Sequence, residues 1–404
     1  MRHHGNMKWL ILTITALFFL FEFVTRVEPS LANSEIAARF QLNNAQFGTL
    51  ASIFFWIYAP MQLIVGLLLD RFGARRLIPP AILICASGVI LFATAGNAYI
   101  AGIGRFATGL GASFAFVGSL YVVNHWFGAG RFAVLSGVVN AVGMLGTAIG
   151  AVALTSAITT SGWQNVFWAT GIAGLVLFVI ALLFMRDPPE HVPAAKKTTS
   201  FITPVLVAVR DRNIWLIAII GTLYYMPINV FGGLWGNAEL TKDHGLSAVH
   251  AETAVSMIFW GLAAGSIAAG WLSDHLGHRK WIIVIGAFLT AISFAAAVYL
   301  PTSSLPLLSG LLFLSGFLGG GQMLTFSIAK ERHAAAYSGT IIAFVNMIGI
   351  GGALIFQPLV GAIVDRNNGD FAWAMLTMPA CLLAAALLSL MLTDKRHPDH
   401  IPGR

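Results

Sequence analysis

The chain has 404 residues, of which 57% are hydrophobic and only 10% carry a charged side chain. A soluble domain carries about 25% charged residues, so this composition excludes a soluble globular protein. The apolar residues fall in runs of roughly 20, the length of helix that crosses a ~30 Å hydrocarbon core. A membrane β-barrel would need alternating segments of about ten residues instead. The sequence therefore predicts an all-α protein that crosses a membrane several times.

Twelve membrane spans are predicted in chain order. The first six are expected at 8–28, 46–69, 77–95, 99–123, 132–156 and 165–185, and the last six at 214–234, 252–272, 281–300, 305–328, 337–361 and 371–393. The stretch between these groups is rich in proline, charge and small polar residues, which is typical of a linker. We predict an N-terminal six-helix bundle over 1–185, a cytoplasmic linker over 186–213 and a C-terminal six-helix bundle over 214–404.

The first apolar stretch resembles a signal peptide but is expected to be retained as a span. It contains Glu22 and Arg26 and has no clear small-x-small cleavage site. With the N-terminus in the cytoplasm, most of the 23 Lys and Arg residues fall in cytoplasmic segments. Both termini are therefore predicted to be cytoplasmic. This distribution assigns the net charge of +7 to membrane topology and anionic lipid rather than to nucleic acid.

One short motif occurs twice. GLLLDRFGARR runs from Gly66 to Arg76, and the looser copy GWLSDHLGHRK runs from Gly270 to Lys280. The copies are 204 residues apart (270 − 66), and each follows the second span of its half. A duplication of six helices explains this offset. Because each half has an even number of spans, the two bundles are predicted to be related by a pseudo-two-fold axis along the membrane normal.

On these features the chain resembles the major facilitator superfamily. The motif between spans two and three matches the family pattern at Gly66, Asp70, Arg71, Gly73, Arg75 and Arg76, and a second family pattern in span four is present as Arg105, Gly109 and Gly111. The resemblance implies a transporter that works by alternating access. Span five lacks the proline that is typical of drug/proton antiporters in this family. Within the superfamily the chain is most similar to proteobacterial importers of organic anions and amino acids.

The duplicated motif is interpreted as a conformational gate at the cytoplasmic ends of the spans. Asp70 is expected to cap the N-terminal end of span eleven, where free N–H groups favour an anion, and Asp274 is expected to face span five in the same way. Gly73 permits a tight turn. The predicted gate comprises Gly66, Asp70, Arg71, Gly73, Arg75 and Arg76 in the first copy, with Asp274, Gly277 and Arg279 in the second.

Charged residues within the spans are candidates for function because a charge in the hydrocarbon core costs about 2.5–3.5 kcal/mol on insertion scales. Glu22 lies about 20 Å along span one, and Arg105 lies about 9 Å into span four from the outside, so the two are at similar depth. Arg105 is predicted to bind a substrate carboxylate, with Glu22 and Arg26 in proton coupling. The alternatives are a structural Glu22–Arg26 pair at i and i+4 and a bracing role for Arg105.

Polar residues in other spans complete the predicted substrate site. Thr15 shares a helix face with Glu22 and Arg26, although it could also hydrogen-bond its own backbone. Tyr225 and Asn229 lie in span seven, where proline and glycine are expected to interrupt the helix and expose backbone groups. Gln322 lies in span ten after three glycines. The alternatives are interfacial aromatics and a packing kink in span seven, and a neighbouring helix as the partner of Gln322.

These observations predict a secondary transporter of a small anionic or zwitterionic organic solute, such as a carboxylate, an amino acid or a small peptide, with proton-coupled symport. A proton-coupled exporter of drugs or metabolites is the alternative. The sequence disfavours a non-transporting sensor and a membrane enzyme. No metal site, cofactor or nucleic-acid partner is predicted. The expected partners are the solute, H⁺ and membrane lipid, and the expected form is a monomer in a bacterial inner membrane.

Overall fold

The computed structural model describes residues 2–127, 129–187, 202–334 and 337–393. Over these residues the chain is helical and no strand occurs. Twelve helical segments are long and apolar enough to cross a membrane, which confirms the predicted number of spans. They are Met7–Leu31, Asn44–Phe72, Ala74–Thr94, Ala98–Phe127, Gly137–Ser161, Trp163–Phe184, Arg212–Lys242, Ala248–Ser273, Arg279–Tyr299, Leu305–Lys330, Ser338–Arg366 and Ala372–Ser389.

The helices form two compact units. The N-terminal unit holds 1–42 and 49–197, and the C-terminal unit holds 43–48 and 198–404. The division at 197/198 falls inside the segment predicted as a linker. The N-terminal unit contains α1 (Arg2–Leu31), α2 (Asn33–Phe40), most of α3 (Asn44–Phe72), α4 (Ala74–Thr94), α5 (Ala98–Ala112), α6 (Phe114–Phe127), α7 (Ala129–Ser161) and α8 (Trp163–Phe184).

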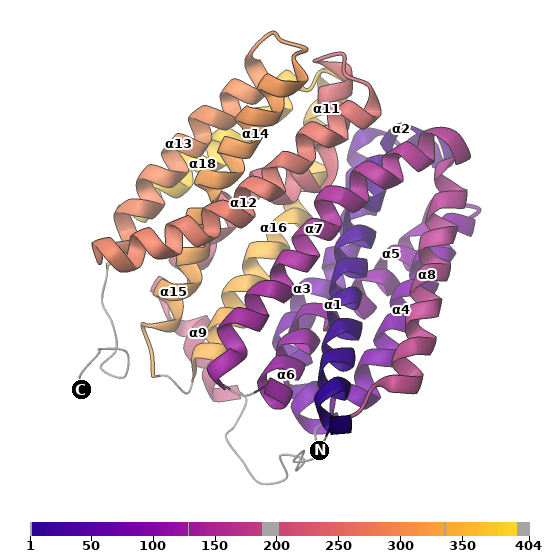
Figure 1. Cartoon of the computed structure of the whole chain (residues 1–404). Helices are drawn as coiled ribbons and strands as arrows, with labels where there is room; N and C mark the ends of the chain where they lie inside the picture. The colour runs from indigo at the N-terminus through magenta and orange to yellow at the C-terminus, as the bar shows by residue number, and fades with distance from the viewer. Residues whose placement is uncertain (1, 128, 188–201, 335–336, 394–404) are drawn as a thin grey trace. The chain divides into compact units, whose positions relative to one another are not determined.

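The C-terminal unit contains a larger number of short elements. They are α9 (Ile202–Arg210), α10 (Arg212–Tyr224), a π-helix (Pro227–Trp235), α11 (Gly236–Lys242), α12 (Ala248–Leu276), α13 (Arg279–Tyr299), α14 (Leu305–Gly319), a 3₁₀ turn (Gly320–Met323), α15 (Leu324–Lys330), α16 (Ser338–Arg366), α17 (Ala372–Met375) and α18 (Thr377–Ser389). Within this unit α12 packs along α14, and α13 packs along both α14 and α18 (Figure 1).

Two helices lie where the sequence suggested loops. α2 follows the first span directly, and α9 occupies part of the segment 186–213 that was predicted to be a linker. α9 has the sequence ITPVLVAVR, whose apolar residues need a packing surface, and it packs on α10 and α16. Asp211 separates α9 from α10. Its side chain caps the start of α10 by accepting a hydrogen bond from the Asn213 N–H at 2.8 Å.

Glycines let the helices of each unit approach closely, as predicted for span four. A Cβ added at Gly109 would lie 2.1 Å from the Phe54 carbonyl oxygen, and one at Gly111 would lie 2.3 Å from the Ala81 carbonyl oxygen. In the C-terminal unit, a Cβ at Gly265 would lie 1.9 Å from the backbone oxygen of Phe317. These positions accept only glycine because the backbone of the neighbouring helix occupies the space.

The two motif copies both turn on a glycine with positive φ. Gly73 has φ +79° and Gly277 has φ +70°, values that residues with a Cβ rarely adopt. In the first copy the backbone N–H of Arg75 donates to Asp187 Oδ1 at 3.0 Å. In the second copy the Arg279 guanidinium forms an ion pair with Glu331. Each motif is therefore tied to an acidic residue from a later loop of its own unit.

Candidate functional site

The centre of the candidate site is a charged pair on one face of α1. Glu22 and Arg26 are one helical turn apart, which brings their side chains together. Arg26 Nε donates to Glu22 Oε1 at 2.9 Å, and a second guanidinium nitrogen contacts the same oxygen. The guanidinium also donates to the Tyr58 hydroxyl of α3 at 2.9 Å. The Glu22 side chain is fully buried, whereas that of Arg26 is 10% exposed.

Aromatic rings surround the Arg26 guanidinium. Its central carbon lies 4.6 Å from the centroid of Phe23, 5.0 Å from that of Tyr58 and 5.9 Å from that of Phe54. Tyr58 and Phe54 are stacked, with centroids 5.2 Å apart. Ring faces attract a cation, and more strongly where water is excluded. The cluster therefore fixes a positive charge in an apolar setting while leaving part of it accessible.

Arg105 lies beside this cluster but uses its guanidinium differently from the sequence-based prediction. It is buried, and it donates to the carbonyl oxygens of Thr25 at 2.8 Å, Arg26 at 3.2 Å and Ala51 at 3.3 Å. Three backbone acceptors on α1 and α3 thus occupy its two terminal nitrogens. This geometry favours the bracing role that the sequence left open, with Arg105 joining α5 to α1 and α3.

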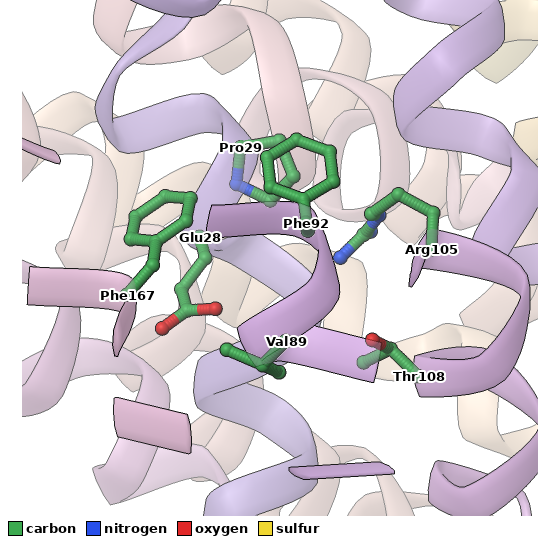
Figure 2. Close-up of a pocket in the computed structure, with 7 residues that line it drawn as sticks. All are labelled: Glu28, Pro29, Val89, Phe92, Arg105, Thr108 and Phe167. Carbon is green, nitrogen blue, oxygen red and sulfur yellow. The ribbon is translucent and has the colours of Figure 1, made fainter. Parts of the chain in front are cut away.

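Sequence reasoning missed Glu28. The first span was predicted to end at residue 28, which would place this carboxylate at the membrane surface. The structure continues α1 to Leu31, and Glu28 is buried with 3% exposure. It lines a small cavity together with Arg105 (Figure 2). Proline usually marks a helix boundary, yet α1 continues through Pro29 to Leu31.

Span seven is interrupted as predicted, and the form of the interruption is a π-helix. α10 ends at Tyr224, and Pro227–Trp235 has the wider helix, which frequently occurs at functional sites. Within this segment, Asn229 Nδ2 donates to the Ile350 carbonyl oxygen at 3.2 Å, and Gln357 Nε2 donates to the Asn229 carbonyl oxygen at 3.1 Å. Asn229 therefore ties the π-helix to α16, as the packing alternative foresaw.

The other predicted substrate residues have separate surroundings. Thr15 is buried and its hydroxyl donates to the Leu12 carbonyl oxygen at 3.1 Å, so it does bond its own helix. Tyr225 is half-buried at the C-terminal end of α10. Gln322 is buried in the 3₁₀ turn that divides span ten. The structure thus joins Glu22, Arg26 and Arg105 in one cluster of the N-terminal unit and places Tyr225, Asn229 and Gln322 in the other unit.

The predicted gate residues lie at helix ends. Asp70 and Arg71 are exposed at the end of α3, and Arg75 and Arg76 are exposed at the start of α4. A Cβ added at Gly66 would meet nothing within 4 Å among the described residues. The side chain of Asp274 lies outside the described residues.

Comparison with known sequences identifies the family. The sequence model of the Major Facilitator Superfamily matches residues 11–237 and, a second time, residues 217–404. The chain belongs to the Major Facilitator Superfamily. As a member of that superfamily with twelve apolar spans, it is an integral membrane protein. The two matches overlap over residues 217–237.

Individual relatives of this superfamily member are distant but cover nearly its whole length. It is 24% identical to the probable galactarate/D-glucarate transporter GudP of Bacillus subtilis, over 96% of this chain and 92% of the relative. It is also 24% identical to a putative tartrate transporter of Agrobacterium vitis, over 95% of this chain and 89% of the relative. The crystal structure of a bacterial homologue of the human lysosomal transporter Spinster is similar in fold, with a TM-score of 0.74, 16% identity and 95% of both chains covered.

Proposed function

We propose that this protein is a secondary transporter that carries small organic anions by alternating access and couples their movement to protons. Relatives named as transporters of galactarate, D-glucarate and tartrate support an anionic hydroxycarboxylate as the solute. The coupling to protons rests on this chain's own residues. We also propose a bacterial inner membrane as the location, with both termini in the cytoplasm.

The observation that carries the proposal is the pairing of the Arg26 guanidinium with Glu22, on a side chain that is 10% exposed. Its planar fork matches a carboxylate in geometry and charge. A substrate carboxylate that binds Arg26 competes with Glu22 for the same donors. Displaced from Arg26, the Glu22 carboxylate would be a buried charge without its partner, and it then takes up a proton. Binding of the anion and binding of the proton thereby favour each other.

In this scheme Arg26 takes the substrate role that the sequence assigned to Arg105, and Arg105 keeps the outer parts of α1 and α3 in place. Glu22 keeps its predicted role in proton coupling. Tyr225 and Gln322, at the ends of broken helices in the C-terminal unit, are proposed to bind substrate, as the sequence predicted. The two motif copies around Asp70 and Asp274 are proposed to act in the conformational change rather than in binding.

A ligand screen on the purified protein tests the proposal. D-Glucarate, galactarate and tartrate are compared with the uncharged sugar alcohol galactitol, with amino acids and with an amphipathic drug, and the shift in melting temperature is measured. Stabilisation by the hydroxycarboxylates and none by galactitol is expected. Stabilisation by galactitol alone would contradict an anion site, and stabilisation by the drug alone would favour the exporter alternative.

Proton coupling needs a separate measurement. Protein reconstituted in liposomes is given a stabilising hydroxycarboxylate with and without a pH gradient, at zero membrane potential. Accumulation above the equilibrium level only with the gradient is expected. Equal uptake with and without the pH gradient would show that the protein transports the solute without coupling to protons.

A further inference from the structure

A second buried carboxylate lies in the N-terminal unit, outside the Glu22–Arg26 pair. Glu28 is 3% exposed, and its Oε1 has no hydrogen-bond partner among the described residues. The residue sits on α1, six positions after Glu22. The transport scheme above makes no use of it. An unpaired carboxylate oxygen in this position needs an explanation because burying a charge without a partner is costly.

The unpaired oxygen belongs to a residue that lines a cavity with room for about one water molecule. Most of the wall is apolar and comes from Pro29, Val89, Phe92 and Phe167. The polar remainder is Glu28, Arg105 and Thr108. In Figure 2 the Glu28 carboxyl group and the Arg105 guanidinium, which come from different helices, lie on opposite sides of the group of lining residues. Arg105 Nε is also without a hydrogen-bond partner among the described residues.

Arg105 does not neutralise Glu28 directly. No ion pair within 4 Å joins these two described residues, since the terminal guanidinium nitrogens are committed to carbonyl oxygens on α1 and α3. The other groups around the Glu28 carboxyl are the Thr170 hydroxyl of α8 and the Cys85 thiol of α4. Glu22 and Arg26, the charged residues nearest to Glu28 along α1, are paired with each other. Among the described residues, no lysine or arginine therefore forms an ion pair with the Glu28 carboxylate.

We propose that Glu28 is a proton-binding site, occupied in the conformation described here and linked to the Arg105 brace. A bound proton removes the buried charge and gives the carboxyl group a donor. If the carbonyl contacts of Arg105 break, the guanidinium becomes free to pair with the Glu28 carboxylate, and the proton returns to bulk water. No other bond changes in this step. The site is distinct from Glu22 and does not depend on the identity of the solute.

Infrared spectroscopy of the purified protein tests this assignment. At neutral pH the wild-type spectrum should contain a carboxylic-acid C=O band that disappears in Glu28→Gln and shifts in Glu28→Asp. Glu22→Gln on the same helix is the matched comparison and should leave that band in place. Because Glu239 and Glu252 are also buried, the band is identified in the difference spectrum between wild type and variant. If Glu28→Gln instead loses carboxylate absorbance and keeps the acid band, Glu28 is ionised in the wild type and the proposal is wrong.

Thermal stability gives an independent readout that needs no substrate. Glutamine has the shape of a neutral glutamic acid, so Glu28→Gln should melt at or above the wild-type temperature at neutral pH. The difference should grow in favour of the variant as the pH rises, because the wild-type carboxyl then loses its proton. A variant that is markedly less stable at neutral pH, with a difference independent of pH, would show that Glu28 serves as a charged partner in the fold.

Discussion

Arg26 donates from Nε to Glu22 Oε1 across one turn of α1 at 2.9 Å, and the acceptor side chain is fully buried while the donor side chain is 10% exposed. Of the two side chains, only that of Arg26 has exposed surface. In the proposed function an anion binds Arg26 and displaces the Glu22 carboxylate. This asymmetry distinguishes the pair from an interfacial salt bridge, in which both partners are hydrated and contribute little.

Arg26→Lys should weaken binding of a hydroxycarboxylate by roughly 10- to 100-fold. Lysine keeps the charge but loses the planar fork, and a hydrogen bond to a charged group contributes about 1.5–3 kcal/mol. Isothermal titration calorimetry measures the change. Arg39→Lys, at an exposed position on α2, is the matched control. Equal affinity in both variants would remove Arg26 from the anion site.

Glu22→Gln should abolish uphill uptake in liposomes while sparing exchange of solute across the membrane. The amide cannot release a proton, so the protein remains in the state that binds the anion and cycles only with solute bound. Glu35→Gln, at an exposed carboxylate, should behave as wild type. If pH-driven accumulation is unchanged in Glu22→Gln, the coupling site lies elsewhere, and Glu28 becomes the next residue to replace.

Gly109→Ala should destabilise the N-terminal unit by at least about 1–3 kcal/mol, the usual cost of overpacking. The added Cβ would lie 2.1 Å from the Phe54 carbonyl oxygen, which is backbone and cannot rotate away. Gly310→Ala on α14 is the control, since a Cβ there meets nothing within 4 Å and alanine favours a helix. In detergent, the melting temperature of Gly109→Ala should fall below that of the wild type, and that of Gly310→Ala should not.

Stability should decline at alkaline pH through His244, which lies in the loop before α12. The Glu239 carboxylate, whose Oε1 lies 3.4 Å from His244 Nε2, raises the pKa of His244 from 6.5 to about 9 by accepting from the imidazolium. Burial opposes this increase, and the Thr302 carbonyl oxygen adds to it. Its two ring nitrogens lie 2.7 Å from Thr302 O and 3.1 Å from Val298 O, so both must be protonated to donate.

Because the folded pKa of His244 is the raised one, its contribution to stability is complete below pH 6.5 and is lost as the pH rises through about 9. The melting temperature of wild type should therefore fall across this window, and the slope should be smaller in His244→Gln. His250→Gln, at an exposed histidine on α12, should keep the wild-type slope. Parallel curves for wild type and His244→Gln would exclude the imidazolium as the cause.

Much of the architecture follows from the sequence because the lipid bilayer restricts which backbone structures can cross it. A hydrocarbon core about 30 Å thick dictates the length of each apolar run, and the backbone must satisfy its hydrogen bonds within the helix. The twelve spans, the interruption at Pro227 and the positive φ at Gly73 and Gly277 are local consequences of residue type. The repeated motif and the family pattern in span four were likewise sufficient to indicate the superfamily.

The contacts of the buried side chains could not be predicted from the sequence, because they depend on which helices pack together and on how each helix is rotated about its axis. Depth along a helix correctly placed Glu22 near Arg105, yet it could not show that three carbonyl oxygens would occupy the Arg105 guanidinium. An extra turn of α1 carried Glu28 from the expected membrane surface into a buried cavity. The sequence by itself determined the number of spans and their approximate positions, since these follow from the rise of one helix and the thickness of one membrane. Only the tertiary structure decided which charges are paired and which are buried alone, since that depends on contacts between helices far apart in the chain.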